Sequence, residues 1–103
     1  MAFEIVLPPD TQNEVDEFIA RRCSSRDQES AVVGALDEEL GKLAANPTLG
    51  AVPIGTPFET RRIHRFTILV GDTVRTVEFI YSVRKEAERL VISGFREVPP
   101  NAL

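Results

Sequence analysis

Three arginines and a histidine stand within five residues of one another, directly before an apolar run. Arg61, Arg62, His64 and Arg65 precede residues 66–70, which read Phe-Thr-Ile-Leu-Val and are typical of a strand. Guanidinium groups bind phosphate, and histidine is the side chain whose ordinary pKa suits proton transfer near neutrality. This block is therefore the first place in the chain to look for anion binding or acid–base chemistry.

The 103-residue chain carries a net charge of −4, and its two halves differ in sign. Residues 1–60 hold four Lys/Arg against eleven Asp/Glu, a net of −7, whereas residues 61–103 hold eight against five, a net of +3. One surface of such a molecule can meet an anionic partner while the rest keeps it in solution. The length fits a single domain, and the composition is that of an ordinary soluble protein.

Several functional classes lack their sequence signals. Cys23 is the only cysteine, which excludes an internal disulfide and a cysteine-based zinc site, and we interpret it as a core residue of a helix. Residues 37–39, Asp-Glu-Glu, point in different directions on a helix and are interpreted as a solvated face. There is no glycine-rich phosphate loop, zinc spacing or nucleophile elbow, so we expect no metal and no cofactor. Because the chain has neither a basic leader nor an apolar stretch of roughly 20 residues, we expect a cytoplasmic protein with no membrane partner.

The first half of the chain predicts two amphipathic helices, at residues 11–23 and 25–45. Each begins with the spacing of a capping box, Thr11 with Glu14 and Ser25 with Gln28. Apolar residues follow at helical intervals in both segments. The short link between the segments predicts an antiparallel helical hairpin.

The remaining segments predict four strands, at residues 3–7, 61–70, 74–83 and 89–96. A loop rich in proline and glycine covers residues 46–60. One face of the third strand must pack on the helices, and its residues are Arg75, Val77, Phe79, Tyr81 and Val83. Both faces of the last strand are partly apolar, so its register stays open. The prediction is an α+β domain of order β-α-α-β-β-β, with the helical hairpin packed on a small antiparallel sheet.

This element order resembles that of the RelE/ParE superfamily of bacterial type II toxin–antitoxin toxins. Residues 40–50, Leu-Gly-Lys-Leu-Ala-Ala-Asn-Pro-Thr-Leu-Gly, are similar to the superfamily's L-x-x-x-P-x-x-G segment. Residues 61–62, 75–83 and 89–96 are similar to its R … y-R-v-x-Y-x-v … v-x-I-x-x-v-x-R pattern. The resemblance covers nearly the whole chain and implies one toxin domain over residues 1–103.

The resemblance also implies a partner and a set of site residues. A cognate antitoxin protein is expected to neutralise the toxin in a hetero-oligomer. Superfamily members that cut mRNA on the ribosome use basic side chains on the sheet, which stabilise the charge that develops when a ribose 2′-hydroxyl attacks the neighbouring phosphate. The matching positions here are Arg75 and Arg96 as catalytic arginines, His64 as the proton-transfer group, and Arg61, Arg62 and Arg65 as phosphate contacts.

Two departures from the ribonuclease pattern favour the ParE branch, whose members poison DNA gyrase by binding. The tail, residues 98–103, lacks the tyrosine, histidine or lysine that ribonuclease members often carry there, and the acidic balance differs from that of strongly basic, ribosome-dependent members. We therefore expect a gyrase inhibitor, with an mRNA endoribonuclease or a non-toxic binding member as alternatives. The arginine block could equally be a solvated face that balances the acidic helices, and His64 could be a structural residue.

Overall fold

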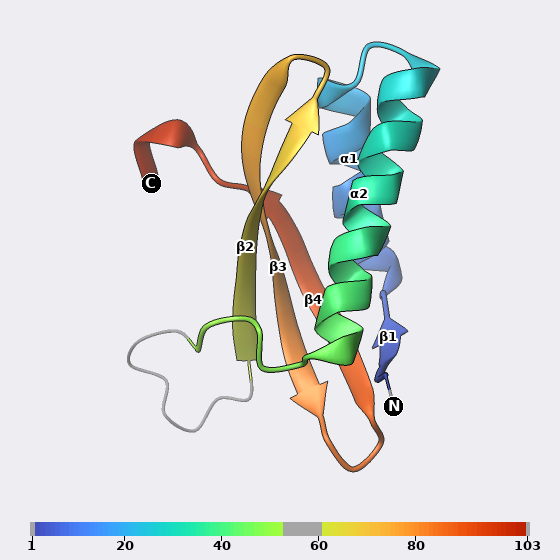
Figure 1. Cartoon of the computed structure of the whole chain (residues 1–103), viewed down its shortest axis with the longest axis vertical. Helices are drawn as coiled ribbons and strands as arrows, with labels where there is room; N and C mark the ends of the chain where they lie inside the picture. The colour runs from blue at the N-terminus through green and yellow to red at the C-terminus, as the bar shows by residue number, and fades with distance from the viewer. Residues whose placement is uncertain (1, 53–60, 103) are drawn as a thin grey trace.

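The computed structural model describes residues 2–52 and 61–102 (Figure 1). Its elements run in the predicted order and are β1 (Glu4–Val6), α1 (Pro9–Arg22), α2 (Arg26–Ala45), β2 (Arg61–Val70), β3 (Thr73–Arg84), β4 (Arg89–Glu97) and a 3-10 helix at Pro100–Ala102. The loop predicted over residues 46–60 is described as far as residue 52, and residues 53–60 lie outside the described part. No helix among the described residues is long and apolar enough to cross a membrane.

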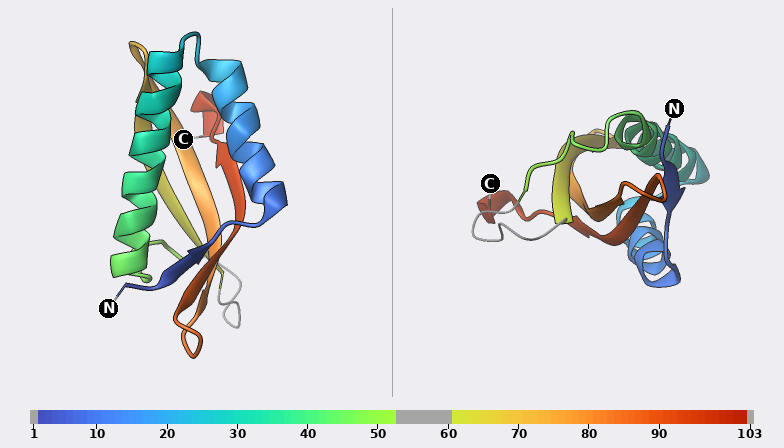
Figure 2. Two further views of the ribbon diagram at one scale, coloured as in Figure 1. Left: turned by 90° about the vertical axis from the view of Figure 1, so that its right-hand side faces the viewer. Right: turned by 90° about the horizontal axis from the view of Figure 1, so that it is seen from below.

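The four strands form one sheet in the order β1-β4-β3-β2. β2, β3 and β4 pair antiparallel, as predicted. β1 differs, because it pairs parallel with β4 from Glu4 opposite Arg89 to Val6 opposite Val91, so the sheet is mixed and not wholly antiparallel. Parallel neighbours need a long connection, and here two helices and two strands lie between the paired strands. Both helices cover the same face of the sheet, which is the predicted α+β architecture (Figure 2).

α1 begins before the predicted capping box. Pro8 is its N-cap residue, and Pro9 occupies the first turn, where its missing N–H leaves no helical hydrogen bond unmade. Thr11 is buried, and its Oγ1 donates a 2.7 Å hydrogen bond to the carbonyl of Ile92 in β4. The prediction that Thr11 caps α1 is therefore wrong, and this side chain fastens the helix to the sheet. α2 begins as predicted, with Ser25 as its N-cap.

An extra residue in β4 settles the register that the sequence leaves open. Gly94 pairs with Ile80 and Ile92 pairs with Tyr81, so Ser93 between them has no partner residue. Such a bulge shifts the alternation of side chains by one position. Before it, the even-numbered residues of β4 face the helices, and after it the odd-numbered residues do. This is why both faces of the strand read as partly apolar in the sequence.

The core lies between the helices and the sheet. It is formed by Val15, Phe18, Val32, Leu36, Leu43, Ile68, Val70, Val77, Phe79, Tyr81, Leu90, Ile92 and Phe95. The rings of Phe18, Phe95, Phe79 and Phe66 follow one another from α1 across β4 and β3 to β2, with centroids 5.2 to 5.5 Å apart. Cys23 packs against this core, as predicted, and burial raises the pKa of its thiol.

Tyr81 of β3 anchors the segment that follows α2. Its hydroxyl accepts a 2.9 Å hydrogen bond from the N–H of Gly50 and donates a 2.7 Å bond to the carbonyl of Pro47. Ala51 then pairs with Ile63 along the edge of β2 that lies away from β3. A Cβ atom on Gly50 would lie 2.7 Å from the Tyr81 hydroxyl oxygen and 2.9 Å from the Ile63 carbonyl oxygen. This position therefore requires glycine.

We expect Gly50→Ala to lower the free energy of unfolding by about 1–3 kcal/mol, because the added methyl group meets a fixed tyrosine and fixed backbone. Gly34→Ala is the matched control, since a Cβ there meets no atom within 4 Å. In the interior of α2 it should raise the free energy of unfolding by about 0.5–1 kcal/mol. Urea unfolding followed by circular dichroism measures both. Equal effects of the two substitutions would contradict this packing of Gly50.

Candidate functional site

A buried carboxylate holds two arginines on the outer face of the sheet, the face away from the helices. Arg65 of β2, Glu78 of β3 and Arg96 of β4 lie opposite one another in register. Glu78 is 0% exposed; its Oε2 accepts a 3.2 Å hydrogen bond from Arg65 Nε, and its Oε1 accepts one from Arg96 Nε. A carboxylate buried without a partner would be strongly destabilising, so both guanidinium groups serve the fold here.

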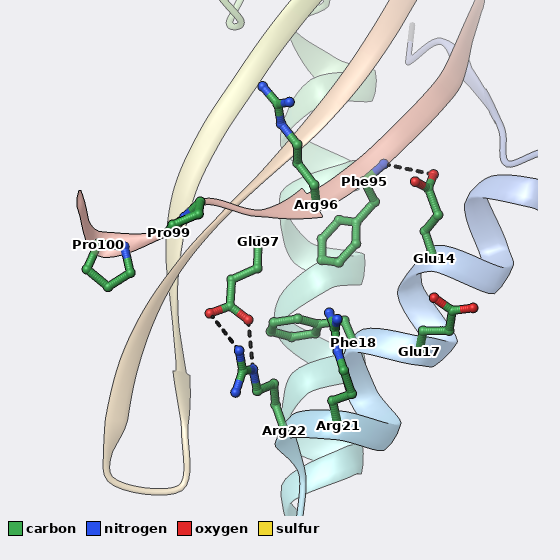
Figure 3. Close-up of a pocket in the computed structure, with 10 residues that line it drawn as sticks. All are labelled: Glu14, Glu17, Phe18, Arg21, Arg22, Phe95, Arg96, Glu97, Pro99 and Pro100. Atoms are coloured by element: carbon green, nitrogen blue, oxygen red, sulfur yellow. Dashed lines mark hydrogen bonds and ion pairs between the residues drawn. The ribbon is translucent and has the colours of Figure 1, made fainter. Parts of the chain in front are cut away.

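A second ion cluster lies on the helix-facing side, where β4 ends. Glu97 accepts a 2.8 Å hydrogen bond from Arg22 Nε and a 3.1 Å bond from Arg75 Nη1. The Nε atom of Arg75 is buried and has no hydrogen-bond partner among the described residues. Beside the cluster is a cleft of about 440 Å³, with Phe18 and Phe95 among its apolar lining (Figure 3). Arg75 of β3 and Arg22 of α1 thus bind the same carboxylate group.

The structure does not bring the three expected catalytic residues together. Arg75 lies on the helix-facing side of β3, whereas Arg96 points to the outer face toward Glu78. His64 is on the helix-facing side, but it lies four positions along β2 from Ile68, the residue opposite Arg75. At about 3.3 Å per residue, this is about 13 Å. A single phosphate group cannot contact both arginines in this arrangement.

His64 is held against α2. Its Nε2 lies 2.8 Å from Oε2 of Glu39, whose Oε1 accepts a 3.0 Å hydrogen bond from Lys42 Nζ. The imidazole stacks on Phe66 at a centroid distance of 5.3 Å, and its side chain is 12% exposed. Burial would raise the pKa of Glu39, but the hydrogen bonds from His64 and Lys42 outweigh burial and lower that pKa. This geometry joins α2 to β2 and leaves little of the imidazole open to a substrate.

The three arginines expected to contact phosphate do not share a face. Arg61 and Arg65 lie on the outer face of β2, and Arg62 lies on the helix-facing side. Arg62 Nη1 donates a 2.8 Å hydrogen bond to the carbonyl of Gly50, while Arg65 belongs to the cluster around Glu78. Strand alternation thus separates side chains that are neighbours in the sequence.

Sequence reasoning missed two features of the charged surface. The sequence analysis gives Glu78 no role, although a carboxylate inside the run Val-Glu-Phe-Ile indicates that it needs a partner. A cleft of about 960 Å³ near the β3–β4 turn was also not expected. Its cationic lining comprises Arg62, Arg84, Lys85 and Arg89. Among the described residues, no group of three His, Cys, Asp or Glu side chains could hold a metal ion.

The lowered pKa of Glu39 predicts a stabilising contribution that acid removes. The contribution is fully present above the ordinary value of 4.5 and is lost as the pH falls through the lower pKa of the folded state. We expect the difference in unfolding free energy between the unmodified chain and Glu39→Gln to be smaller at about pH 3 than at about pH 6. Urea unfolding at several pH values measures it, with Glu38→Gln as the exposed control for net charge. A difference independent of pH would contradict the pairing of Glu39.

Similarity to known proteins is found by comparison of structures and not by comparison of sequences. The sequence matches no protein-family profile and no curated protein sequence. Among solved structures, the chain is similar to E. coli toxin RelE, in a mutant with two arginines replaced by alanine and in the free state. The TM-score is 0.56 with 11% sequence identity, over 92% of this chain and 82% of that chain. The chain therefore has a RelE-like fold, as its sequence motifs predict.

Proposed function

We propose that residues 1–103 form the toxin of a type II toxin–antitoxin module that acts by binding its target. DNA gyrase is the target that the ParE resemblance implies, and a cognate antitoxin neutralises the toxin. The RelE-like fold supports the toxin assignment. The observation that favours binding over RNA cleavage is that Arg65, Arg75 and Arg96 are already paired with carboxylates.

Cleavage of RNA by attack of a 2′-hydroxyl group needs cations placed where charge develops on the phosphate. Arg65 and Arg96 are both bonded to one buried carboxylate, and Arg75 shares Glu97 with α1. A phosphate that approached any of these guanidinium groups would also meet the negative charge of its carboxylate partner. The two expected catalytic arginines also point to opposite faces of the sheet. These contacts favour a structural role for the sheet arginines.

The groove between the helices supports an antitoxin as partner. It has a volume of about 160 Å³, and its lining includes the apolar side chains of Val15, Leu36 and Phe79. Val33 of α2 lies at the same groove and is one of the exposed large hydrophobic residues. An extended or helical antitoxin segment that laid apolar side chains in this groove would bury that surface. In this arrangement the antitoxin neutralises the toxin by covering the surface between its two helices.

A second candidate, a RelE-like mRNA endoribonuclease, is favoured by the structural likeness to RelE. It requires Arg75 or Arg96 to leave its carboxylate partner when RNA binds. In that case His64 would have to leave Glu39 to take part in proton transfer. The two candidates therefore differ in their dependence on the sheet guanidinium groups.

We expect Arg75→Gln and Arg96→Gln to arrest the growth of E. coli as strongly as the unmodified chain does. Each substitution removes one positive charge, but Glu78 keeps Arg65 and Glu97 keeps Arg22 as a cationic partner. Growth after induction and primer extension on cellular mRNA measure the two activities. Thermal unfolding of each variant verifies folding, and Lys85→Gln, at the exposed β3–β4 turn, is the control for loss of one positive charge.

A ribonuclease would give a different pattern. Loss of a guanidinium group that stabilises the transition state lowers the rate by about 100-fold or more. If either glutamine variant folds but loses both growth arrest and mRNA cleavage, the binding proposal is wrong. If the unmodified chain produces no mRNA ends and the variants still arrest growth, the binding proposal is supported.

A further inference from the structure

The outer edge of β2 carries backbone groups with no strand beside them. Ile63 uses its N–H and C=O, at 2.9 Å each, to pair with Ala51 on the side away from β3. Because these groups alternate in direction along an antiparallel strand, Arg65, Thr67 and Leu69 point theirs to that same side. Within residues 2–52 and 61–102, no hydrogen bond reaches these groups. Figure 1 shows β2 at the edge of the sheet opposite β1.

Apart from the charge of Arg65, this edge lacks the features that usually prevent pairing with another chain. Protected edges carry charges, proline or a bulge, or are covered by another segment. Residues 66–70, Phe-Thr-Ile-Leu-Val, contain no charge and no proline, and β2 pairs with β3 without a register shift. On the outer face, Leu69 is 60% exposed and its cross-strand neighbour Val74 is 66% exposed. The edge is therefore suited to accept a strand.

The stretch of β2 from Arg65 to Leu69, called the free stretch below, can pair with the same stretch of a second copy. When Thr67 lies opposite Thr67 of a second copy, Arg65 lies opposite Leu69 of that copy, and the reverse pair forms at the other end. Each of these pairs exchanges two backbone hydrogen bonds. The contact between the two β2 edges is called the seam. No two like charges lie opposite each other across the seam, and the aliphatic stem of each Arg65 can cover an exposed leucine.

The boundaries of the free stretch select this register. In the same alignment, the next pair would be Ile63 with Gly71 of the other copy. Ile63 is already paired with Ala51, and Gly71 is in the turn after β2 with a φ of 63°. A symmetric register shifted by one residue either way leaves Arg65 or Leu69 without a strand partner. The register centred on Thr67 pairs all three free positions.

We propose that two copies of this chain associate through antiparallel pairing of their β2 edges, centred on Thr67. The two four-stranded sheets become one continuous sheet, with the helices of both copies on the same face. The association is isologous, because the same three residues of each copy form the seam. It does not depend on the identity of any cellular target.

The first test is sedimentation equilibrium of the refolded full chain from about 1 µM to about 1 mM. We expect a monomer–dimer equilibrium for the unmodified chain. Thr67→Pro should remove the dimer, because its N–H points to the seam and not to β3, so proline is compatible with the fold. Val74→Lys is the matched control. It changes the exposed apolar pair on the outer face without touching the seam, and it should leave the dimer in place.

The second test uses charge at Leu69 and does not depend on the folding of the proline variant. Leu69→Lys places like charges opposite both arginines of the seam and should weaken the dimer by about tenfold. Leu69→Glu places a carboxylate opposite each Arg65 and should keep or strengthen the dimer. Opposite results for the two variants support this register.

Four results would overturn the proposal. The chain could remain monomeric up to about 1 mM, a concentration at which even weak association is detected. Folded Thr67→Pro could dimerise as well as the unmodified chain, or the two charge variants at Leu69 could behave alike. An edge that stays free in the isolated chain and is filled only by a strand of a co-produced protein would also show that a second copy is not the occupant.

Discussion

The bulge at Ser93 is the constraint on which the charged surfaces of this protein depend. It inserts one residue into β4 and reverses which side chains face the helices from that point onward. Phe95 can therefore join the core with Leu90 and Ile92, although its spacing from them is odd. The same shift sends Arg96 to the outer face. A strand without the bulge would bury Arg96 on the helix-facing side, the side of Arg75.

The bulge thereby places the two ion clusters on opposite faces of the sheet. On the outer face, Arg96 meets Glu78 in register, and Arg65 completes the group from β2. On the helix-facing side, Glu97 lies at the end of β4, where arginines from α1 and β3 reach it. Each cluster holds two arginines on one carboxylate, so these guanidinium groups are paired within the fold while each cluster keeps a net positive charge. This pairing is the observation that supports the proposal of a toxin that acts by binding.

Local sequence signals predicted most of the helices and strands, because the start and end of each element depend on nearby residues. The apolar run at residues 66–70 marked β2, and the Ser25 cap marked the start of α2. The local signal of the bulge is ambiguous, because the partly apolar faces of the strand and Gly94 after Ser93 do not fix where the alternation changes. The parallel pairing of β1 depends on a strand more than eighty residues away. The residue types of the candidate site were predicted, but their grouping was not, because the burial of Glu78 requires the register of three strands.

The most direct measurement is the order in which incorporation of labelled thymidine and labelled methionine falls after this chain is induced in bacteria. Binding to DNA gyrase predicts that thymidine incorporation falls first, together with DNA-damage signalling, while methionine incorporation falls later. An early fall in methionine incorporation alone would contradict this account. It would mean that translation is the target and that the ion pairs of Arg75 and Arg96 open to meet RNA.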